Sequence, residues 1–194
     1  MSMDFNDAQP QGATGIIPDG TVAPVIINVR GIPKSKTGAT GLDLEFTVIE
    51  GPHKGRKAWK WAGIAGNGSE GHNTMVSITR SSIRAMLESA YGIDPADDSQ
   101  EAMNGRRLGD WEDLTGMAFV ARFGVEKGSD YTNERTGEVQ KGKDKNAIVA
   151  VTPDDPAYAG FKPAKPKAGG KAVAKPPANG GAAASGGQTP AWAR

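Results

Sequence analysis

Apolar and polar residues alternate strictly along residues 42–48 (LDLEFTV), which is the period of a half-buried β-strand. The segment 51–55 (GPHKG) then supplies turn residues, because proline presets φ and glycine tolerates positive φ. Residues 56–62 (RKAWKWA) return as a second strand in which cationic side chains interleave with Trp59 and Trp61. The pattern predicts a β-hairpin with one aliphatic face, whose return strand combines residue types that stack on bases and hold phosphates.

Three further segments carry strand patterns. Residues 21–30 (TVAPVIINVR), 117–126 (MAFVARFGVE) and 146–151 (NAIVAV) are rich in β-branched or alternating apolar residues. Pro24 has no N–H to donate to a ladder, so we expect an edge or a bulge at that end of the first strand. Together with the hairpin, these segments predict five strands.

One stretch, residues 77–91 (SITRSSIRAMLESAY), has a helical period. Ser77 and Thr79 are candidate N-caps, and Gly92 follows the end of the pattern. We therefore expect one main helix between the third and fourth strands. Its apolar positions recur at i, i+3, i+4 and i+7 and are Ile83, Met86, Leu87 and Ala90.

Residues 66–71 (GNGSEG) match the spacing G-x-G-x-x-G that occurs in dinucleotide-binding folds. That use requires a strand before the glycines, a helix that opens on them, and a second, parallel strand after the helix. Helical signals begin only near Ser77, and the region around Asp94 is a turn rich in proline and aspartate. We therefore interpret residues 63–74 as a connecting loop.

The composition excludes several kinds of site. The 194 residues include no cysteine, which excludes disulfides and thiolate metal sites, and the two histidines, His53 and His72, lack a partner at metal-ligand spacing. The N-terminus has no signal-peptide pattern, and no run approaches the roughly 18 apolar residues of a membrane helix. We expect a cytoplasmic protein without a metal, a cofactor or a membrane association.

Charge divides the chain into a body and a tail. The net charge is +1, but residues 157–194 carry six cationic residues and no acid, so residues 1–156 sum to −5. The tail is almost entirely Ala, Gly, Lys and Pro, which cannot offset its ordering entropy, and we predict that it is disordered. Residues 1–19 are polar and aperiodic, and we interpret them as an N-terminal arm. The folded domain is therefore predicted to span residues 20–156.

Five strands with one helix between the third and fourth is the chain order of the oligonucleotide/oligosaccharide-binding (OB) barrel. The sequence therefore predicts an all-β fold: a five-stranded OB-fold with one main helix and a disordered C-terminal tail. In that topology the second and third strands bind ligand together with the loops that join strands 1–2 and 4–5. Here those loops are residues 31–41 and 127–145, and both carry cations.

The candidate binding residues are aromatic side chains for base stacking and cationic side chains for phosphate contact. Two alternatives stay open at this point, because tryptophans in strands commonly pack in a core or at its rim, and lysine-bearing loops are commonly only solvated. The aromatic candidates are Trp59, Trp61 and Tyr131. The cationic candidates are Arg30, Lys34, Lys36, Arg56, Lys57, Lys60, Arg122, Lys127, Lys141, Lys143 and Lys145.

Three blocks of the sequence, GIIPDGTVAPVIINVRG, LEFTVIEGPHKGRKAWKW and LTGMAFVARFGVEKG, together with the opening MDFNDA, resemble a family of bacteriophage proteins. That family was long catalogued as a domain of unknown function and is now regarded as single-stranded-DNA-binding proteins of the OB-fold. The resemblance spans roughly residues 3–155, and its most specific element is the turn EGPHKGRK followed by an aromatic residue. It implies a replication or recombination accessory protein that coats single-stranded DNA in the bacterial host cytoplasm.

We also expect partners among phage or host replication and recombination proteins, with the basic C-terminal tail as their candidate attachment point. Two other classes of function stay open: a protein–protein or structural virion module that uses the barrel as a scaffold, and an enzyme that acts on nucleic acid. The sequence shows no nucleophile–base pair and no P-loop spacing, and the acid pairs at 97–98 and 154–155 each lie beside a proline in a turn. We therefore predict no catalytic residues.

Overall fold

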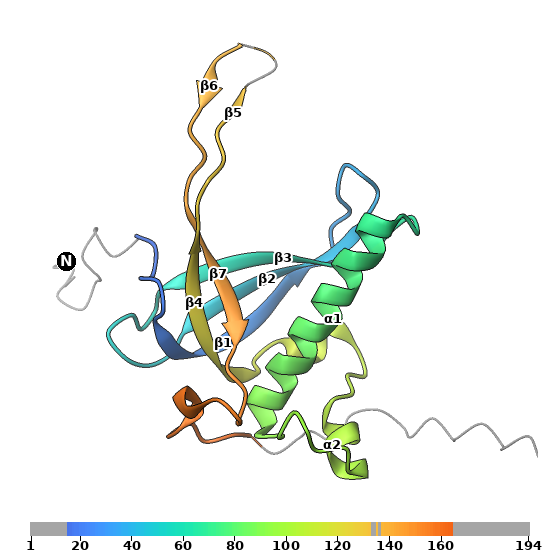
Figure 1. The fold of residues 1–194 in the computed structure, drawn as a ribbon, viewed down its shortest axis with the longest axis vertical. Coiled ribbons are helices and arrows are strands. Elements are labelled where there is room, and N and C mark those ends of the chain that lie inside the picture. The colour runs from blue at the N-terminus through green and yellow to red at the C-terminus, as the bar shows by residue number, and fades with distance from the viewer. Residues whose placement is uncertain (1–14, 133–134, 136, 165–194) are drawn as a thin grey trace, which may run out of the picture.

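The computed structural model describes residues 15–132, 135 and 137–164, and its centre is a five-stranded antiparallel sheet with the strand order β3-β2-β1-β4-β7. One long helix, α1 (Glu70–Tyr91), packs against the curved sheet and lies between β3 and β4 in the chain (Figure 1). The prediction of a mainly β domain with one main helix is confirmed. The five strands are β1 (Val22–Gly31), β2 (Thr40–Val48), β3 (Lys57–Ala65), β4 (Ala118–Glu126) and β7 (Lys145–Ala150).

The apolar faces of the strands form the core, as their alternation predicts. The four apolar residues of 42–48 in β2 are at most 1% exposed, and the Phe46 ring packs edge-on against Phe119 of β4 at a centroid distance of 5.9 Å. β1 is the central strand and pairs with both β2 and β4, so it is not an edge strand. The ladder between β1 and β2 begins at Val25, so Pro24, which has no N–H to donate, lies just outside that ladder.

The helix α1 begins at Glu70 rather than near Ser77, so both predicted N-caps lie inside it. The pattern is obscured there because residues 70–74 (EGHNT) include several poor helix formers. Gly92 ends the helix in the left-handed conformation, with φ of 66°. The four predicted core positions are buried: Ile83, Met86, Leu87 and Ala90.

The glycine segment 66–71 does lie between a strand and the start of α1, as a dinucleotide-binding loop would. However, every ladder of the five-stranded sheet is antiparallel, so the described residues contain no parallel βαβ unit in this sheet. The interpretation of residues 66–68 as a connecting loop is therefore kept, but residues 63–65 of the predicted loop belong to β3 and residues 69–74 belong to α1 or its cap.

β4 and β7 continue beyond the sheet as a long arm, described at residues 127–132, 135 and 137–144, that stands away from the domain (Figure 1). Within it β5 (Tyr131–Thr132) pairs with β6 (Val139–Gln140), so the segment predicted as a long polar loop is a two-stranded projection. β3 and β7 are the edges of the main sheet. Within the described residues no ladder joins these two edges, so the sheet is curved but not closed.

The domain also begins earlier than predicted. Ile17, which we assigned to the N-terminal arm, is 1% exposed. Its N–H donates to Asn146 Oδ1 at 3.0 Å, and the Asn146 side-chain amide donates back to the Ile17 carbonyl at 2.8 Å. Residues 15–19 therefore belong to the domain, and residues 1–14 lie outside the described part of the chain.

At the other end, the domain extends past the predicted boundary at residue 156. After the short helix η2 (Pro156–Tyr158), the Tyr158 hydroxyl donates to the Ser89 carbonyl of α1 at 2.6 Å. The Ala164 N–H donates to another carbonyl of the same helix end at 2.9 Å. Residues 157–164 thus pack against α1, and the rest of the predicted tail, 165–194, is outside the described residues.

Two short helices, α2 (Gln100–Gly105) and η1 (Trp111–Leu114), connect α1 to β4. The Ser99 hydroxyl caps α2 by accepting a hydrogen bond from the Ala102 N–H at 3.2 Å. Among the helices that the structure describes, none is both long enough and apolar enough to pass through a membrane.

Candidate nucleic-acid interface

The tryptophans of β3 lie on the outer face of the sheet, away from the core. The register aligns Trp59 with Glu45 and Trp61 with Asp43 of β2, and all four side chains share one face because side chains alternate along a strand. Trp59 is 52% exposed and Trp61 is 40% exposed. Lys57 shares this face by the same alternation. These five residues form what we call the tryptophan face.

Glu45 holds the side chains of two residues in β3. Lys57 Nζ donates to Glu45 Oε1 at 2.8 Å, and the indole Nε1–H of Trp59 donates to Oε2 at 3.2 Å. The hydrogen bond from Lys57 lowers the pKa of the Glu45 carboxyl, burial opposes this, and the hydrogen bond from Trp59 lowers it further. The Trp59 ring is therefore tethered by one edge while about half of the residue stays exposed.

Trp61 is positioned by a glycine in the neighbouring strand. A Cβ added to Gly41 would lie 2.3 Å from Trp61 Cε2 and 2.4 Å from Cζ2, so the indole lies directly over the Gly41 backbone. This glycine is required for close approach, since its φ is not positive. Packing on the sheet fixes the position of the Trp61 ring and leaves part of it open to solvent.

The loop between β1 and β2, residues 32–39, carries two of the predicted cations. Its backbone is tied together, because the Ser35 N–H donates to the Ala39 carbonyl at 2.7 Å and the Ala39 N–H donates to Ser35 Oγ at 3.1 Å. Lys34 and Lys36 are exposed, and neither makes an ion pair with a residue that the structure describes. We call this segment the lysine loop.

The arm carries three further cationic candidates, and one of them, Lys127, has an acidic partner at its base. Lys127 Nζ donates to Asp144 Oδ2 at 2.7 Å, and the Gly128 N–H donates to Oδ1 at 3.0 Å. The pair raises the pKa of Lys127 and lowers that of Asp144. Lys141 and Lys143 are exposed and have no ion pair within the described residues. Lys141 and Lys143 thus add exposed cations to the described part of the arm.

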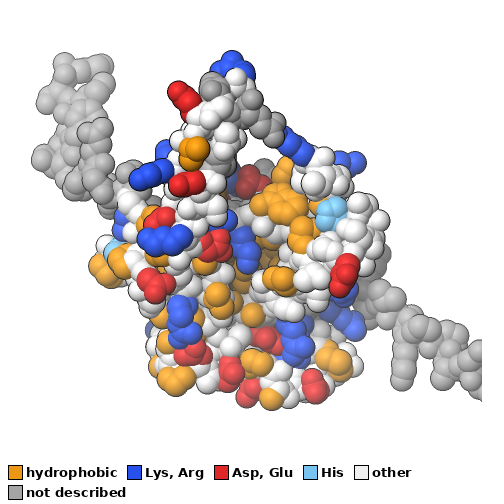
Figure 2. All heavy atoms as spheres, turned by 45° about the horizontal axis from the view of Figure 1, so that its top comes forward, with side chains coloured by type: hydrophobic (Ala, Val, Ile, Leu, Met, Phe, Trp, Pro, Cys, Tyr) orange, Lys and Arg blue, Asp and Glu red, His pale blue; other side chains and the backbone are white. Residues whose placement is uncertain are grey.

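β3 runs from the foot of the arm toward the foot of the lysine loop, and both projections rise from the same side of the domain (Figure 1). Looking down on that side, Figure 2 shows hydrophobic side chains gathered beside the arm with lysine or arginine side chains near them. The third aromatic candidate, Tyr131, pairs with Gln140 in the arm, but its side chain is outside the described part of the structure.

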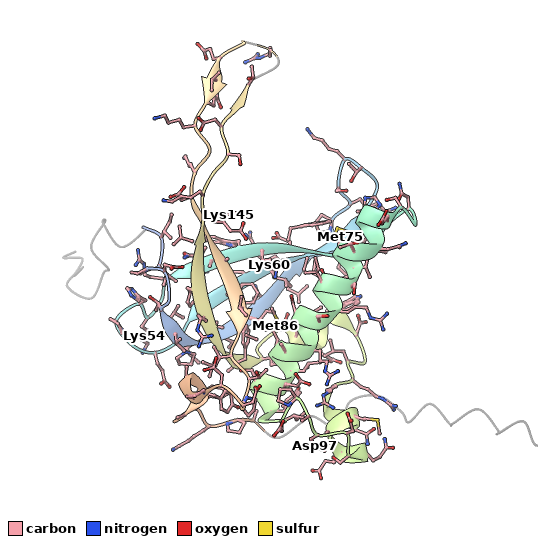
Figure 3. All side chains as sticks on the ribbon, viewed as in Figure 1. Lys54, Lys60, Met75, Met86, Asp97 and Lys145 are labelled. Carbon is pink, nitrogen blue, oxygen red and sulfur yellow. The ribbon has the colours of Figure 1, made fainter. Side chains whose placement is uncertain are left out.

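Lys60 lies away from the tryptophan face. It points to the inner side of β3 and is partly buried, and burial lowers its pKa while Glu126 acts in the opposite direction. Figure 3 labels it where β3 passes the foot of the arm, close to the label of Lys145, which pairs with Glu126 at 2.9 Å. Lys60 therefore faces the open edge between β3 and β7 rather than the tryptophans.

Arg122 also lies away from the tryptophan face. It pairs with Val22 at the start of β1, whereas Asp43, the partner of Trp61, pairs with Gly31 at the end of the same strand. Its guanidinium donates to Asp155 Oδ2 at 2.8 Å. The structure thus places Arg122 at the opposite end of β1 from the strand pair that holds Trp61.

The cationic candidates, taken together, differ in whether another group of the protein already pairs with them. A cation with a partner gains less from a phosphate, because it must give up or share that partner. Those with a polar partner are Arg56 (the Gly15 carbonyl and His53 Nδ1), Lys57 (Glu45), Arg122 (Asp155), Lys127 (Asp144) and Lys145 (Glu126). Those without an ion pair among the described residues are Arg30, Lys34, Lys36, Lys60, Lys141 and Lys143.

Sequence reasoning missed three residues that shape this face: Gly41, Asp43 and Glu45. The two acids could have been found, because counting outward from the turn at residues 51–55 places Glu45 opposite Trp59. Gly41 gives no such signal, since its contact with the indole is diagonal and adjoins an irregularity in the ladder between Thr40 and Gly41.

No protein-family model matches this chain, and no curated protein matches its sequence. Within the described residues, no group of three or more histidine, aspartate or glutamate side chains is placed to hold a metal ion.

Proposed function

We propose that this chain binds single-stranded DNA without sequence preference, and that the tryptophan face is the centre of the binding surface. The observation that carries the proposal is a pair of half-exposed indoles on β3, a strand that runs between two projections whose lysines include four without an ion pair among the described residues. The strand order supports an OB-fold, since β7 takes the place of the fifth OB strand beside β4. The resemblance to phage single-stranded-DNA-binding proteins points the same way.

Bases would stack on Trp59 and Trp61, and each stacked base contributes about 1–3 kcal/mol when judged by truncation of the aromatic residue. Because every base has a flat face, this contact does not select a sequence. The phosphates would lie toward the cations of β1, the lysine loop and the arm that make no ion pair among the described residues: Arg30, Lys34, Lys36, Lys141 and Lys143. Five such contacts correspond to a slope of about −3.5 for log affinity against log salt.

The proposed role is a non-catalytic one: protection of single strands during phage DNA replication or recombination in the bacterial host cytoplasm. Replication or recombination proteins of the phage or host would be its partners. The alternative, a protein-interaction module on an OB-like barrel, could also use the exposed indoles, because tryptophan is a common anchor of protein interfaces. It predicts that Trp59→Ala impairs folding or the capture of a protein partner, whereas the nucleic-acid function predicts a salt-dependent affinity for single strands.

The test is a fluorescence-anisotropy titration of labelled single strands of about 30 nucleotides and of the matching duplex, at several salt concentrations. We expect tighter binding to the single strand, a salt slope near −3.5, and a loss of affinity in Trp59→Ala. Val149→Ala is the matched control, because it truncates an exposed apolar side chain of β7 outside the tryptophan face. Equal affinity for duplex and single strand, or binding that ignores salt, would count against the proposal.

A further inference from the structure

The tryptophan face carries negative charge at its centre, which is unexpected for a surface that meets DNA. Asp43 and Glu45 lie in β2 directly beside the two tryptophans of β3. Glu45 is largely covered by its hydrogen bonds to Lys57 and Trp59, whereas Asp43 makes no hydrogen bond or ion pair with a described residue. Arg30, near the end of β1, is close enough to help lower the pKa of the Glu45 carboxyl. The lysine loop and the arm carry further cations that make no ion pair among the described residues.

These charges constrain how a nucleic acid can lie on the face. A phosphate placed over β2 would come close to Asp43, which has no partner among the described residues, and to Glu45, whose charge is partly balanced by Lys57. Two like charges 4 Å apart repel by about 1 kcal/mol even in water. A single strand avoids this cost by turning its bases toward the indoles and its phosphates toward the lysines at either side. A duplex cannot turn its bases toward the indoles, because they are stacked inside the double helix and phosphates line its outer surface.

We propose, on the basis of the function proposed above, that Asp43 and Glu45 are specificity residues that exclude paired DNA from this face. They disfavour a phosphate backbone over β2, so the face accepts a strand only with its bases inward. Stacking on Trp59 and Trp61 supplies the attraction, and the two carboxylates supply the discrimination. The proposal explains why acids share a surface with exposed tryptophans and nearby lysines.

Glu45 also positions the Trp59 ring, since its Oε2 accepts a hydrogen bond from the indole N–H at 3.2 Å. Two substitutions distinguish this positioning role from the repulsion of phosphate. Glu45→Gln removes the charge but keeps an oxygen that can accept from Trp59, whereas Glu45→Ala removes both. Glu45→Ala should therefore weaken single-strand binding, and Glu45→Gln should keep most of it while improving duplex binding.

The experiment compares wild-type protein with Asp43→Asn/Glu45→Gln, using the same labelled single strand and duplex at one salt concentration near physiological. We expect the ratio of single-strand to duplex affinity to fall by about five- to tenfold, since up to two repulsive contacts are removed and salt screens part of each. The control is Asp98→Asn/Glu101→Gln, which removes two charges from exposed acids at α2, the end of the domain away from the arm (Figure 3, beside Asp97). Its ratio should stay within about twofold of wild type.

An unchanged ratio in the double variant, or an equal change in the control, would overturn the inference. If the double variant is unfolded by circular dichroism, Asp43→Asn alone decides the matter, because this side chain has no described partner to lose. A wild-type protein that binds neither DNA form, or both equally, would instead refute the proposed function itself. The two failures are therefore distinguishable in one set of titrations.

Discussion

Replacement of Gly41 by alanine tests whether the position of the Trp61 ring matters for binding. The backbone of Gly41 has no positive φ, so an alanine can adopt its conformation without strain. The added Cβ would, however, lie 2.3 Å from Trp61 Cε2 and 2.8 Å from Nε1. One methyl group therefore displaces the indole without changing the indole itself.

The size of the displacement follows from the contact. Ordinary van der Waals contact begins at 3.4 Å, so the ring must move by about 1.1 Å or more. Since Trp61 is 40% exposed, it can swing outward into solvent. We expect single-strand affinity to fall by most of what a stacked base contributes, about 1–3 kcal/mol or roughly 5- to 150-fold. The free energy of unfolding should fall by less than about 2 kcal/mol, because the lost contact is partly offset by a less flexible unfolded chain.

The assay is anisotropy with a single-stranded oligonucleotide for Gly41→Ala, Trp61→Ala and the double variant, with urea unfolding of each. Gly31→Ala is the matched control, since it is also a strand glycine without positive φ, and its Cβ would meet nothing within 4 Å. We expect the double variant to bind no more weakly than Trp61→Ala, because both changes remove the same contact.

Two results would refute this reasoning. If Gly41→Ala binds single-stranded DNA like wild type while Trp61→Ala binds it weakly, the Trp61 ring contributes to binding regardless of its position. Losses that simply add in the double variant would show that Gly41 and Trp61 act on binding independently.

Three further predictions concern charge, pH and the C-terminal segment. Lys36→Ala/Lys143→Ala should flatten the slope of log affinity against log salt by about 1.4. Lys127→Ala should change the slope less, because Asp144 already neutralises that lysine. Titration of single-stranded DNA over a series of salt concentrations measures both effects. The lowered pKa of Glu45 stabilises the fold above the ordinary value of 4.5, and this contribution is lost as the pH falls through the folded pKa. Glu45→Gln should therefore lose less stability than wild type in urea unfolding between about pH 5 and pH 3, and an identical loss would contradict the cause given for the shift. Tyr158→Phe removes the hydroxyl that donates to the Ser89 carbonyl of α1 at 2.6 Å. The variant should lose about 1 kcal/mol of stability and be cleaved faster by proteases after residue 156. An unchanged rate of proteolysis would show that other contacts hold the segment.

Much of the sheet could be predicted because the relevant signal is local. The alternation in residues 42–48 and the turn at 51–55 specify a hairpin, and the structure confirms both. The same periodicity predicts which face is buried, since side chains two apart in a strand must share a face. Trp59 and Trp61 were therefore expected on one side, and they lie there.

Other features escaped prediction because their signal is spread over distant parts of the chain. The start of α1 at Glu70 is hidden by weak helix formers, and packing of the helix against β3 and β4 overrides that local preference. Residues 157–164 (AYAGFKPA) are rich in alanine and contain glycine and proline, yet Tyr158 anchors them to a helix end 69 positions away. No local pattern in a short segment reveals a partner so remote.

For the candidate site, the sequence by itself determined which residue types are present: indoles beside cations on one strand, and lysines in the two connections that flank it. Only the tertiary structure decided that both indoles are exposed, that Gly41 supports one and Glu45 tethers the other, and that Lys57 and Lys127 already have acidic partners. The physical reason is that the direction of a side chain depends on the period of its own strand, whereas exposure and ion pairing depend on what other strands bring against it.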